Sequence, residues 1–552
     1  MGTPPIRLHD TYYHDNFLYV LAHVERLYAS FLTPFETGFL SDFRALSISA
    51  QCLYIRMTNR KGRFFRPSKL IYAEIKDTAT AWQELHKNGF ISSPAINDEW
   101  DALDLVRLFT VGELKEVLKS VGVEAKKANR EELILLLFET FTLAKMRDRL
   151  LELEEVVEMA KLEQLEMIRL FFFGHPWGDM SQFVIRDIGN ARFETYDEEL
   201  FKPQFRSYDE VSQLFDLHQQ YRALKRAMLV EDEALIDEAV GALTYVPENL
   251  SPVAESIVKK FIMRTGKWYE QNKYLERAAI TYSRHSLPES RERLVRVLIG
   301  LGKKDDAKEV LQRIAAEPET HSEWLFASDQ LVKLSGTKQV LTTTRVMKEA
   351  PELMVPKPDG SLNIEEHVLI TLREQGFEGA HTENYIWRSL FGLVFWEELY
   401  SQERALIHQP LQRVPLDLQD RRYLKSRYQA FEHFLSVFES KQQLQEKVYV
   451  TMQAKENIVN PWVGWHPDLA AHMEALFRHL SLEQLKEISL EMARNPLENG
   501  TGLPDLFVWN SDDYHFWEVK SPTDHLSAHQ VFWINFMKEH GVKVEVLRIV
   551  YN

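Results

Sequence analysis

The fold of the last third of the chain is decided by GLPDLFVWNSDDYHFWEVK, residues 502–520. Its apolar run, 506–509, is typical of a strand that is buried on both faces. Residues 510–513 read Asn-Ser-Asp-Asp, which favour a turn, and 514–520 is expected to return as an antiparallel strand. The stretch therefore predicts a β-hairpin with Asp505 at its start.

Polar residues of this hairpin, Asp505, Glu518 and Lys520, form a candidate catalytic set. Side chains alternate along a strand, so Glu518 and Lys520 share a face, and the hairpin brings Asp505 close to them. The two carboxylates, with the backbone carbonyl of Val519, would hold Mg²⁺ or Mn²⁺ at about 2.1 Å. Lys520 would orient or activate a water, as metal-assisted hydrolysis of a phosphodiester requires. The alternative is a surface ion pair between Glu518 and Lys520, with an Asp505 that only begins a strand.

The residues after the hairpin complete an α/β pattern. Ser527 precedes a helix that is expected to start at Ala528 and end at Gly541, and 542–550 begins with the alternation of a final strand. Gln530 either closes a capping box with Ser527 or takes part in catalysis.

Length and composition describe a multidomain globular protein. The chain has 552 residues, of which 45% are hydrophobic and 27% charged, so roughly three or four packed units are expected. Cys52 is the only cysteine, which excludes intramolecular disulfides and thiolate zinc clusters, so a metal must bind oxygen or nitrogen. The net charge of −16 argues mildly against a nucleic-acid partner, although clustering of basic residues matters more than the sum.

The sequence has neither an apolar signal peptide at its start nor an apolar run long enough to span a bilayer. No membrane partner is therefore expected. We expect a cytoplasmic, nucleoid-associated protein if the source is bacterial and a nuclear one if it is eukaryotic.

Residues 1–100 are expected to form a helical, winged-helix-like unit. Apolar residues recur at helical spacing between 10 and 72, and a basic stretch interleaved with aromatic residues follows the second helical run. These cations could contact a DNA backbone; the alternative is a solvated basic face beside ordinary core aromatics. The candidate DNA-binding residues of this stretch are Arg56, Arg60, Lys61, Arg63, Arg66 and Lys69.

Residues 101–145 predict two short helices around a turn at Gly122, with Thr110 and Glu113 as a capping box. The segment resembles the SAP-type DNA-binding module. That resemblance implies that Lys126, Lys127 and Arg130 contact DNA. A plain helical hairpin is the alternative.

Residues 146–350 are expected to be a helical, tetratricopeptide-like repeat region. Such an array acts as a rigid connector or binds a protein partner. The Pro-rich residues 351–360 are expected to be a linker that opens the last domain, 351–552.

The Pro-Asp…Glu-x-Lys pattern of Asp505, Glu518 and Lys520 is the signature of the restriction-endonuclease-like superfamily. Together with residues 521–527, Gln530 and Trp533, it resembles the virus-type replication-repair nuclease domain of the Fanconi-associated nuclease family. The order of the other parts agrees with this family. The resemblance implies a mainly α multidomain protein with a C-terminal α/β restriction-endonuclease-like domain, a mixed sheet flanked by helices.

The resemblance also implies further site residues. Glu383, in Gly-Ala-His-Thr-Glu ahead of an aromatic helix, corresponds to a third metal-binding acid, and Gln412, ahead of a Pro-Leu-Asp-Leu run, to a polar active-site residue. Larger members begin with a cysteine-based ubiquitin-binding zinc finger, which this sequence lacks the cysteines to form. A compact, bacterial-type member is expected.

The function implied by this resemblance is a structure-specific DNA nuclease that cuts 5′ flaps and branched DNA. It would also act as a 5′-to-3′ exonuclease, use Mg²⁺ or Mn²⁺, and serve in interstrand cross-link repair. The expected partner is branched or flapped duplex DNA. One alternative is a catalytically inactive repair scaffold that binds branched DNA, and another is a junction resolvase.

Overall fold

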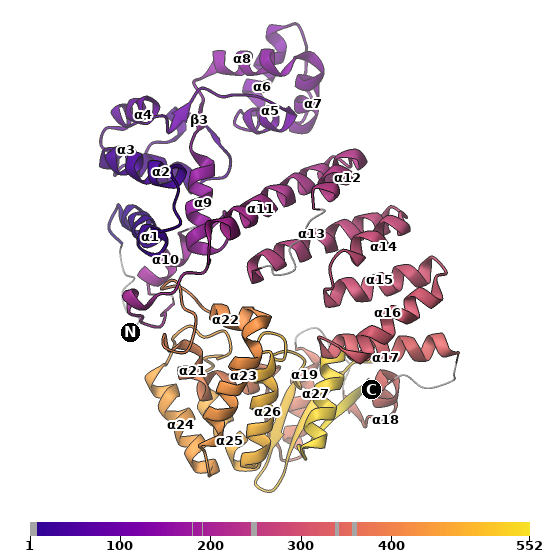
Figure 1. Ribbon diagram of the computed structural model, residues 1–552. Helices are drawn as coiled ribbons and strands as arrows, with labels where there is room; N and C mark the ends of the chain where they lie inside the picture. The colour runs from indigo at the N-terminus through magenta and orange to yellow at the C-terminus, as the bar shows by residue number, and fades with distance from the viewer. Residues whose placement is uncertain are drawn as a thin grey trace. The chain divides into compact units, whose positions relative to one another are not determined.

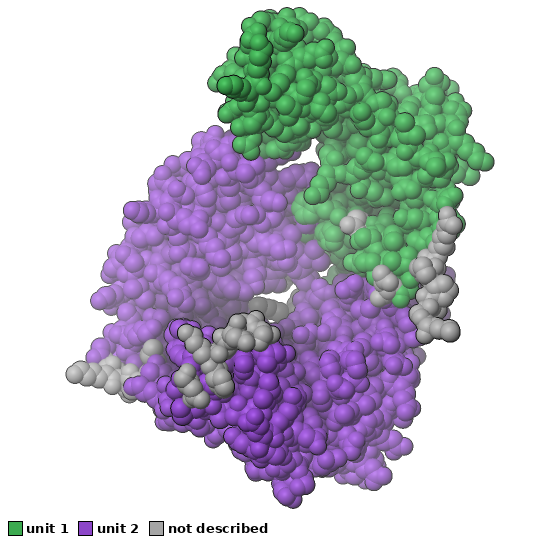
Figure 2. All heavy atoms as spheres, turned by 180° about the vertical axis from the view of Figure 1, so that it is seen from behind, with its two compact units in different colours: residues 1–190, 203–215 green, residues 191–202, 216–552 purple. Residues whose placement is uncertain are grey.

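The structure is a computed structural model that describes residues 8–178, 180–189, 191–243, 251–336, 342–355 and 362–551. Helices dominate it, and a mixed sheet lies near the C-terminal end (Figure 1), which confirms the predicted fold class. The chain divides into two compact units (Figure 2): residues 1–190 with 203–215, and residues 191–202 with 216–552. Each unit is described by itself.

The first unit is a helical body closed by a small sheet. Its elements are α1 (Tyr12–Tyr28), α2 (Pro34–Ala45), α3 (Ile48–Thr58), β1 (Phe64–Phe65), α4 (Thr78–Lys87), β2 (Ile91–Ser92), β3 (Val157–Met159), α9 (Leu162–Phe173) and α10 (Ser181–Asp187). The sheet order is β1-β3-β2, with both pairings antiparallel. Its central strand, β3, thus follows both of its partner strands in the sequence.

A four-helix segment is inserted between β2 and β3. It consists of α5 (Glu99–Val106), α6 (Val111–Ser120), α7 (Arg130–Thr140) and α8 (Leu143–Leu153), whose shared core also includes Phe64 of β1. The predicted capping box is present, with Thr110 and Glu113 bonded reciprocally at the start of α6. Both predicted helices around Gly122 are also confirmed.

The second unit begins with a stack of helices. These are α11 (Tyr208–Leu229, which starts in the first unit), α12 (Glu233–Ala242), α13 (Pro252–Gln271), α14 (Leu275–Ser283), α15 (Pro288–Gly300), α16 (Lys304–Ala316), α17 (His321–Ser335) and α18 (Thr342–Glu349). From α13 to α17 each helix packs against the next, as a repeat array does. Gly266 lets α13 approach α14, because a Cβ there would lie 2.3 Å from the Tyr282 ring.

The rest of the second unit is built on a five-stranded mixed sheet of order β4-β8-β7-β6-β5. Its strands are β4 (Glu352–Val355), β5 (Glu378–His381), β6 (Leu506–Trp509), β7 (Tyr514–Lys520) and β8 (Val544–Tyr551). The β6–β7 hairpin is antiparallel, as predicted, while β8 runs parallel to both β7 and β4. β4 lies within the segment 351–360, so the expectation of a linker there is wrong for residues 352–355, and residues 356–360 lie outside the described residues.

Helices cover both faces of this sheet. α19 (Ile364–Glu374) packs on the face formed by Leu506, Val508 and Val519. The opposite face, with Phe507 and Phe516, is covered by a larger group. Its members are α20 (Tyr385–Val394), α21 (Trp396–Tyr400), α22 (Leu416–Gln419), α23 (Arg421–Ser436), α24 (Lys441–Ala454), α25 (Leu469–His479), α26 (Leu482–Arg494) and α27 (Ala528–Glu539).

Candidate active site

The structure brings Asp505, Glu518 and Lys520 together on one face of the sheet. β6 begins at Leu506, which pairs with Trp517, so Asp505 stands directly beside Glu518 across the hairpin. The Asp505 Oδ2 accepts a hydrogen bond from the Val519 amide at 2.8 Å, and the Lys520 Nζ lies 2.8 Å from the Glu518 Oε1. Glu518 is 0% exposed. An exposed ion pair on an edge strand is therefore excluded.

The two carboxyl groups strongly perturb each other. Burial, followed by the negative charge of Asp505, raises the pKa of Glu518 to about 8, although Lys520 opposes the change. Burial also raises the pKa of Asp505, against the Val519 amide and Lys520, which lower it. Two acids held this close cannot both ionise readily without an added positive charge.

One oxygen of the cluster lacks a partner. Among the described residues, the buried Glu518 Oε2 has no hydrogen-bond donor, whereas Oε1 accepts from both Lys520 and Gln530. An unpartnered buried carboxylate oxygen is costly, and a bound cation would remove that cost. The donor set, carboxylate oxygens with a nearby backbone, is also the set that Mg²⁺ and Mn²⁺ prefer. The residues present therefore fit a divalent ion.

Glu383 reaches this cluster through its backbone. The amides of Thr382 and Glu383 donate to the Asp505 carbonyl at 2.7 and 3.0 Å, as the chain leaves β5. The Glu383 side chain is 64% exposed and lies 3.7 Å from the His381 Nε2. In the described residues no group of three acids, histidines or cysteines has the geometry of a closed metal site. Glu383 thus lies next to Asp505 and Glu518, and its own exposed side chain is free to change orientation.

The turn that carries Glu383 is fixed by a strained residue. Asn384, at the start of α20, has a φ of 64°, in the left-handed region that asparagine tolerates better than most residues. Its Oδ1 accepts from the Leu503 amide at 2.8 Å, so one side chain ties the start of α20 to the approach to Asp505. No pattern in the sequence marks this role of Asn384.

Gln530 combines the two roles that the sequence left open. It forms the capping box with Ser527 at the start of α27, and its Nε2 also donates to the Glu518 Oε1 at 2.5 Å. The glutamine thereby orients the buried acid. Glu365, in the first turn of α19, is a further negative charge that raises the pKa of Asp505. No local pattern marks Glu365, because its proximity to Asp505 arises from the fold.

Gln412 is held within its own loop in this structure, and the expectation that it belongs to the active site stays a prediction. Its Oε1 accepts from the amide and ring of His408, and its Nε2 donates to the carbonyls of Leu406 and Val414 at 2.9 Å. The side chain is 8% exposed. All these bonds stay within the loop before α22, and they engage both the oxygen and the nitrogen of the amide.

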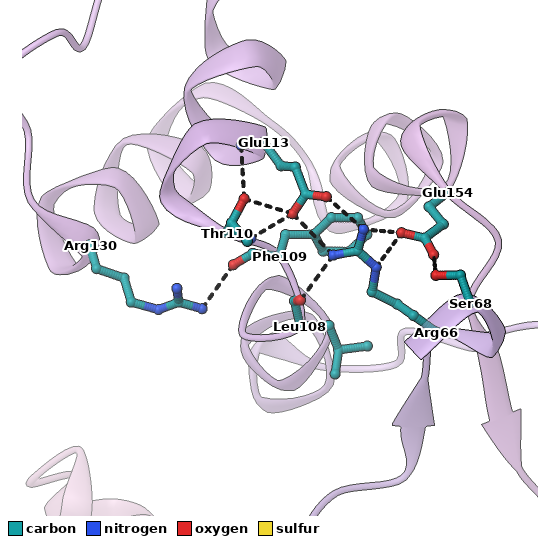
Figure 3. A network of polar contacts seen from close by, with 8 residues as sticks. All are labelled: Arg66, Ser68, Leu108, Phe109, Thr110, Glu113, Arg130 and Glu154. Atoms are coloured by element: carbon teal, nitrogen blue, oxygen red, sulfur yellow. Dashed lines mark hydrogen bonds and ion pairs between the residues drawn. The ribbon is translucent and has the colours of Figure 1, made fainter. Parts of the chain in front are cut away.

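The expectation that Arg66 contacts DNA is wrong, because its side chain is buried and fully engaged. Figure 3 shows its guanidinium between Glu113 of α6 and Glu154, with the Leu108 carbonyl as a further acceptor. The Arg66 Nη2 lies 2.6 Å from the Glu113 Oε1, and this contact holds the pKa of Glu113 down at about 2. Arg66 joins the small sheet to the inserted helices and cannot reach a DNA phosphate.

The other basic candidates of the first unit fall into two groups. Arg56 is held by Glu74 at 2.5 Å and Arg63 by Asp101 at 2.8 Å, so their charges are largely matched. The remaining three candidates, Arg60, Lys61 and Lys69, are exposed.

The inserted segment presents its own cations. Lys126 is 84% exposed beside Glu124, and Lys127 is exposed on the same loop. Arg130 donates to the carbonyls of Arg107 and Phe109, which gives it a structural role. The two lysines are thus the accessible members of this set.

Family models match two parts of the chain. The FAN1, HTH domain matches residues 11–92, and the VRR-NUC domain matches residues 439–550. The chain is 28% identical to the Fanconi-associated nuclease 1 homolog of Pseudomonas aeruginosa over 97% of its own length and 95% of the relative's. It is 23% identical to the Arabidopsis thaliana homolog over 98% of this chain and 67% of that relative.

Solved structures agree with these matches. The structure of paFAN1 bound to 5′-flap DNA with a 2-nucleotide flap and a gap has a TM-score of 0.85 and 25% identity, and covers 99% of this chain and 100% of that one. The structure with a 1-nucleotide flap has a TM-score of 0.83. The sheet, its VRR-NUC domain and the buried acids define a nuclease of the Pro-Asp…Glu-x-Lys class. These matches together support a bacterial-type member of the Fanconi-associated nuclease family.

Across the described residues, no helix is both long and apolar enough to cross a membrane.

Proposed function

We propose that the chain is a structure-specific nuclease that hydrolyses phosphodiester bonds at 5′ flaps and related branches of duplex DNA, with 5′-to-3′ exonuclease activity and a role in interstrand cross-link repair. The unpartnered Glu518 Oε2 beside Asp505 carries the proposal, because it leaves a cation-binding position at the catalytic end of the sheet. The flap-bound paFAN1 structures, matched over the whole chain, support the choice of substrate.

Each residue of the proposed active site would have a separate role. Asp505 and Glu518 supply the buried acids, and Gln530 with Lys520 fixes the Glu518 carboxyl by holding its Oε1. The Lys520 ammonium would orient the attacking water and offset negative charge near the phosphate. Glu383 would turn its exposed side chain toward the pair when DNA and metal are bound. A Mg²⁺ or Mn²⁺ ion held by Asp505, Glu518, the Val519 carbonyl and Glu383 would neutralise the scissile phosphate and lower the pKa of a bound water.

The other parts of the chain would bind the DNA. In the proposed division, 1–100 is a winged-helix-like unit, 101–145 a SAP-like module, 146–350 a repeat region and 351–552 the nuclease domain. The accessible cations of the first two parts, Arg60, Lys61, Lys69, Lys126 and Lys127, would contact phosphates. The placement of β3, α9 and α10 in the first compact unit suggests that its DNA-binding body extends beyond residue 145.

The test is cleavage of an end-labelled 5′-flap duplex with Mn²⁺ or Mg²⁺ by the wild-type chain and by Asp505→Ala. We expect cutting that EDTA abolishes and that the variant loses. As a matched control we choose Asp512→Ala, which removes a turn carboxylate seven residues along the same hairpin; it should keep its activity.

A wild-type chain that binds flap DNA without cutting it, or any nicked or single-stranded substrate, would overturn the enzyme proposal and favour a repair scaffold. Paired symmetric cuts in four-way junctions, made by a dimer, would instead favour a resolvase.

A further inference from the structure

A cavity with polar and apolar lining lies beside the proposed nuclease site. It has a volume of about 440 Å³ and follows the outer edge of β5, which is the edge strand of the sheet. α19 forms one wall, and the start of α20 with the residues around α25 forms the other. Its side chains include Arg373, His381, Tyr385, His466 and His472. We call it the histidine cavity.

The histidine cavity is continuous with the catalytic end of the sheet. His381 is the last residue of β5 and pairs with Leu506, the residue after Asp505. Its ring lies 3.7 Å from the Glu383 carboxylate. Adjacent strands are about 4.8 Å apart. A nucleic-acid strand that leaves Asp505 and Glu518 toward β5 therefore enters the cavity directly.

One wall of the cavity is aromatic. The rings of His466 and His472 are stacked with centroids 5.9 Å apart, and the Tyr385 ring lies 6.0 and 5.8 Å from them. The Tyr385 hydroxyl is hydrogen-bonded to the His472 Nδ1, which fixes both rings. Burial lowers the pKa of His472, so its ring is uncharged at neutral pH. The His466 side chain is 54% exposed and presents a flat surface to solvent.

The opposite wall carries a cation. Arg373 is exposed in the last turn of α19, and within the part of the chain that the structure describes no carboxylate forms an ion pair with it. The acids of the cavity are occupied elsewhere: Glu366 accepts from the Asn363 amide at 3.1 Å in a capping box, and Asp468 lies 3.6 Å from the His466 ring. The Arg373 guanidinium donates one long bond, of 3.5 Å, to the Gly379 carbonyl and keeps further donors. Such a cation opposite a stack of rings suits a phosphate and a base.

We propose that the histidine cavity binds one nucleotide of the strand that passes through the nuclease site, with its base on His466 and its phosphate on Arg373. This inference rests on the proposed function, because the strand is the one that Asp505 and Glu518 would cut. The cavity would fix the strand next to the scissile bond and thereby help to set the cleavage position. Stacking accepts any base, so the site would select an unpaired nucleotide without selecting a sequence.

The first test is fluorescence of 2-aminopurine placed at successive positions of the flap substrate and bound to full-length Asp505→Asn, which cannot cut. We expect a change of intensity at one or two neighbouring positions beside the scissile bond. Adding His466→Ala should remove that change, while the exposed control His433→Ala should keep it. A uniform response at all positions, or a change that survives His466→Ala, overturns the inference.

The second test separates a base contact from a structural role. In the active chain, His466→Ala should lower kcat/KM by roughly tenfold on the intact flap. It should have no effect on a flap with an abasic nucleotide at the responsive position. Arg373→Ala should reduce the salt dependence of binding by about one phosphate. Equal losses on intact and abasic substrates overturn the inference while the proposed nuclease function stands; a wild-type chain that neither binds nor cuts flaps overturns both.

Discussion

Two buried ionic clusters of the protein differ in how completely their polar atoms are satisfied. Around Arg66, a buried guanidinium meets Glu113, Glu154 and the Leu108 carbonyl. At the other cluster, a wholly buried Glu518 stands beside a second acid and keeps one oxygen without a partner among the described residues. The Arg66 cluster is complete within the chain, whereas the Glu518 cluster keeps an unpartnered oxygen that fits a cation from outside it.

On the proposed function, the difference separates a structural cluster from a catalytic one. Removing one partner from a satisfied buried network lowers the stability of the fold, because a desolvated charge is left behind. An unsatisfied cluster already carries such a cost, so neutralising one of its members relieves the fold and removes the function. Substitutions in the two clusters test this contrast.

The largest effect is expected for Glu518→Gln. Cleavage of flap DNA should fall by at least ~10³-fold, because the side chain can no longer act as an anionic ligand. The unfolding midpoint without metal should stay the same or rise, since the repulsion with Asp505 is gone. Activity and urea unfolding of the same preparation measure both quantities. A variant that loses stability along with activity would contradict the contrast.

Arg66→Ala should behave in the opposite way. Leaving Glu113 and Glu154 without their cation should cost about 3–5 kcal/mol of stability in the first unit. Hydrogen exchange of the amides in 99–153 would report the loss, and the β6–β7 hairpin in the second unit is the internal control. Unchanged protection of the inserted helices would show that the network is not needed to hold them.

Glu518 should also make the stability of the fold depend on pH. Its ordinary pKa of 4.5 is raised to about 8 in the fold. The folded chain therefore binds more protons than the unfolded one between these values, and metal-free stability should fall as pH rises from about 4.5 to 8. Unfolding curves in EDTA and in Mg²⁺ test this: the metal should flatten the dependence, and Glu518→Gln should reduce it. A slope of the other sign would contradict the raised pKa.

Gln530→Ala should have a smaller effect, a loss of activity or of metal affinity of about 10- to 100-fold. The helix α24 offers a matched control, because Ser440 and Gln443 form the same capping box without a carboxylate contact. Gln443→Ala should cost a similar capping energy and no activity. Equal losses of activity in the two variants would mean that Gln530 acts through the helix alone.

The smallest effect is expected for Lys126→Ala combined with Lys127→Ala. These exposed side chains support no core, so stability should not change. The slope of log binding constant against log salt concentration should decrease by about 2, because each lysine would neutralise one phosphate. An unchanged slope would show that this loop stays away from DNA, and Lys145→Ala, an exposed lysine of α8, provides the control.

Local patterns predicted the parts of the fold that depend on near neighbours. The β6–β7 hairpin follows from alternation and turn residues, and the capping boxes at Thr110 and Ser527 follow from a polar pair three residues apart. The approach of Asp505 to Glu518 also follows, because a hairpin alone fixes it. These are the features that a single sequence can specify.

Long-range contacts account for what was missed. β4 pairs with β8, nearly two hundred residues later, so its short Glu-Leu-Met-Val run looked like a linker. The burial of Arg66 depends on Glu154, which is 88 residues away, and a basic stretch cannot reveal that.

The insertion of the four helices before β3 has a consequence for how the chain is made. β1 and β2 both pair with β3, and the register joins Phe64 to Glu158. The ribosome therefore releases the whole inserted segment before the strand that completes the small sheet exists. Local helices form within microseconds and synthesis adds about 5–20 residues per second. The inserted helices can thus form during translation and pack on Phe64, whereas the small sheet is completed only when residue 159 has been added.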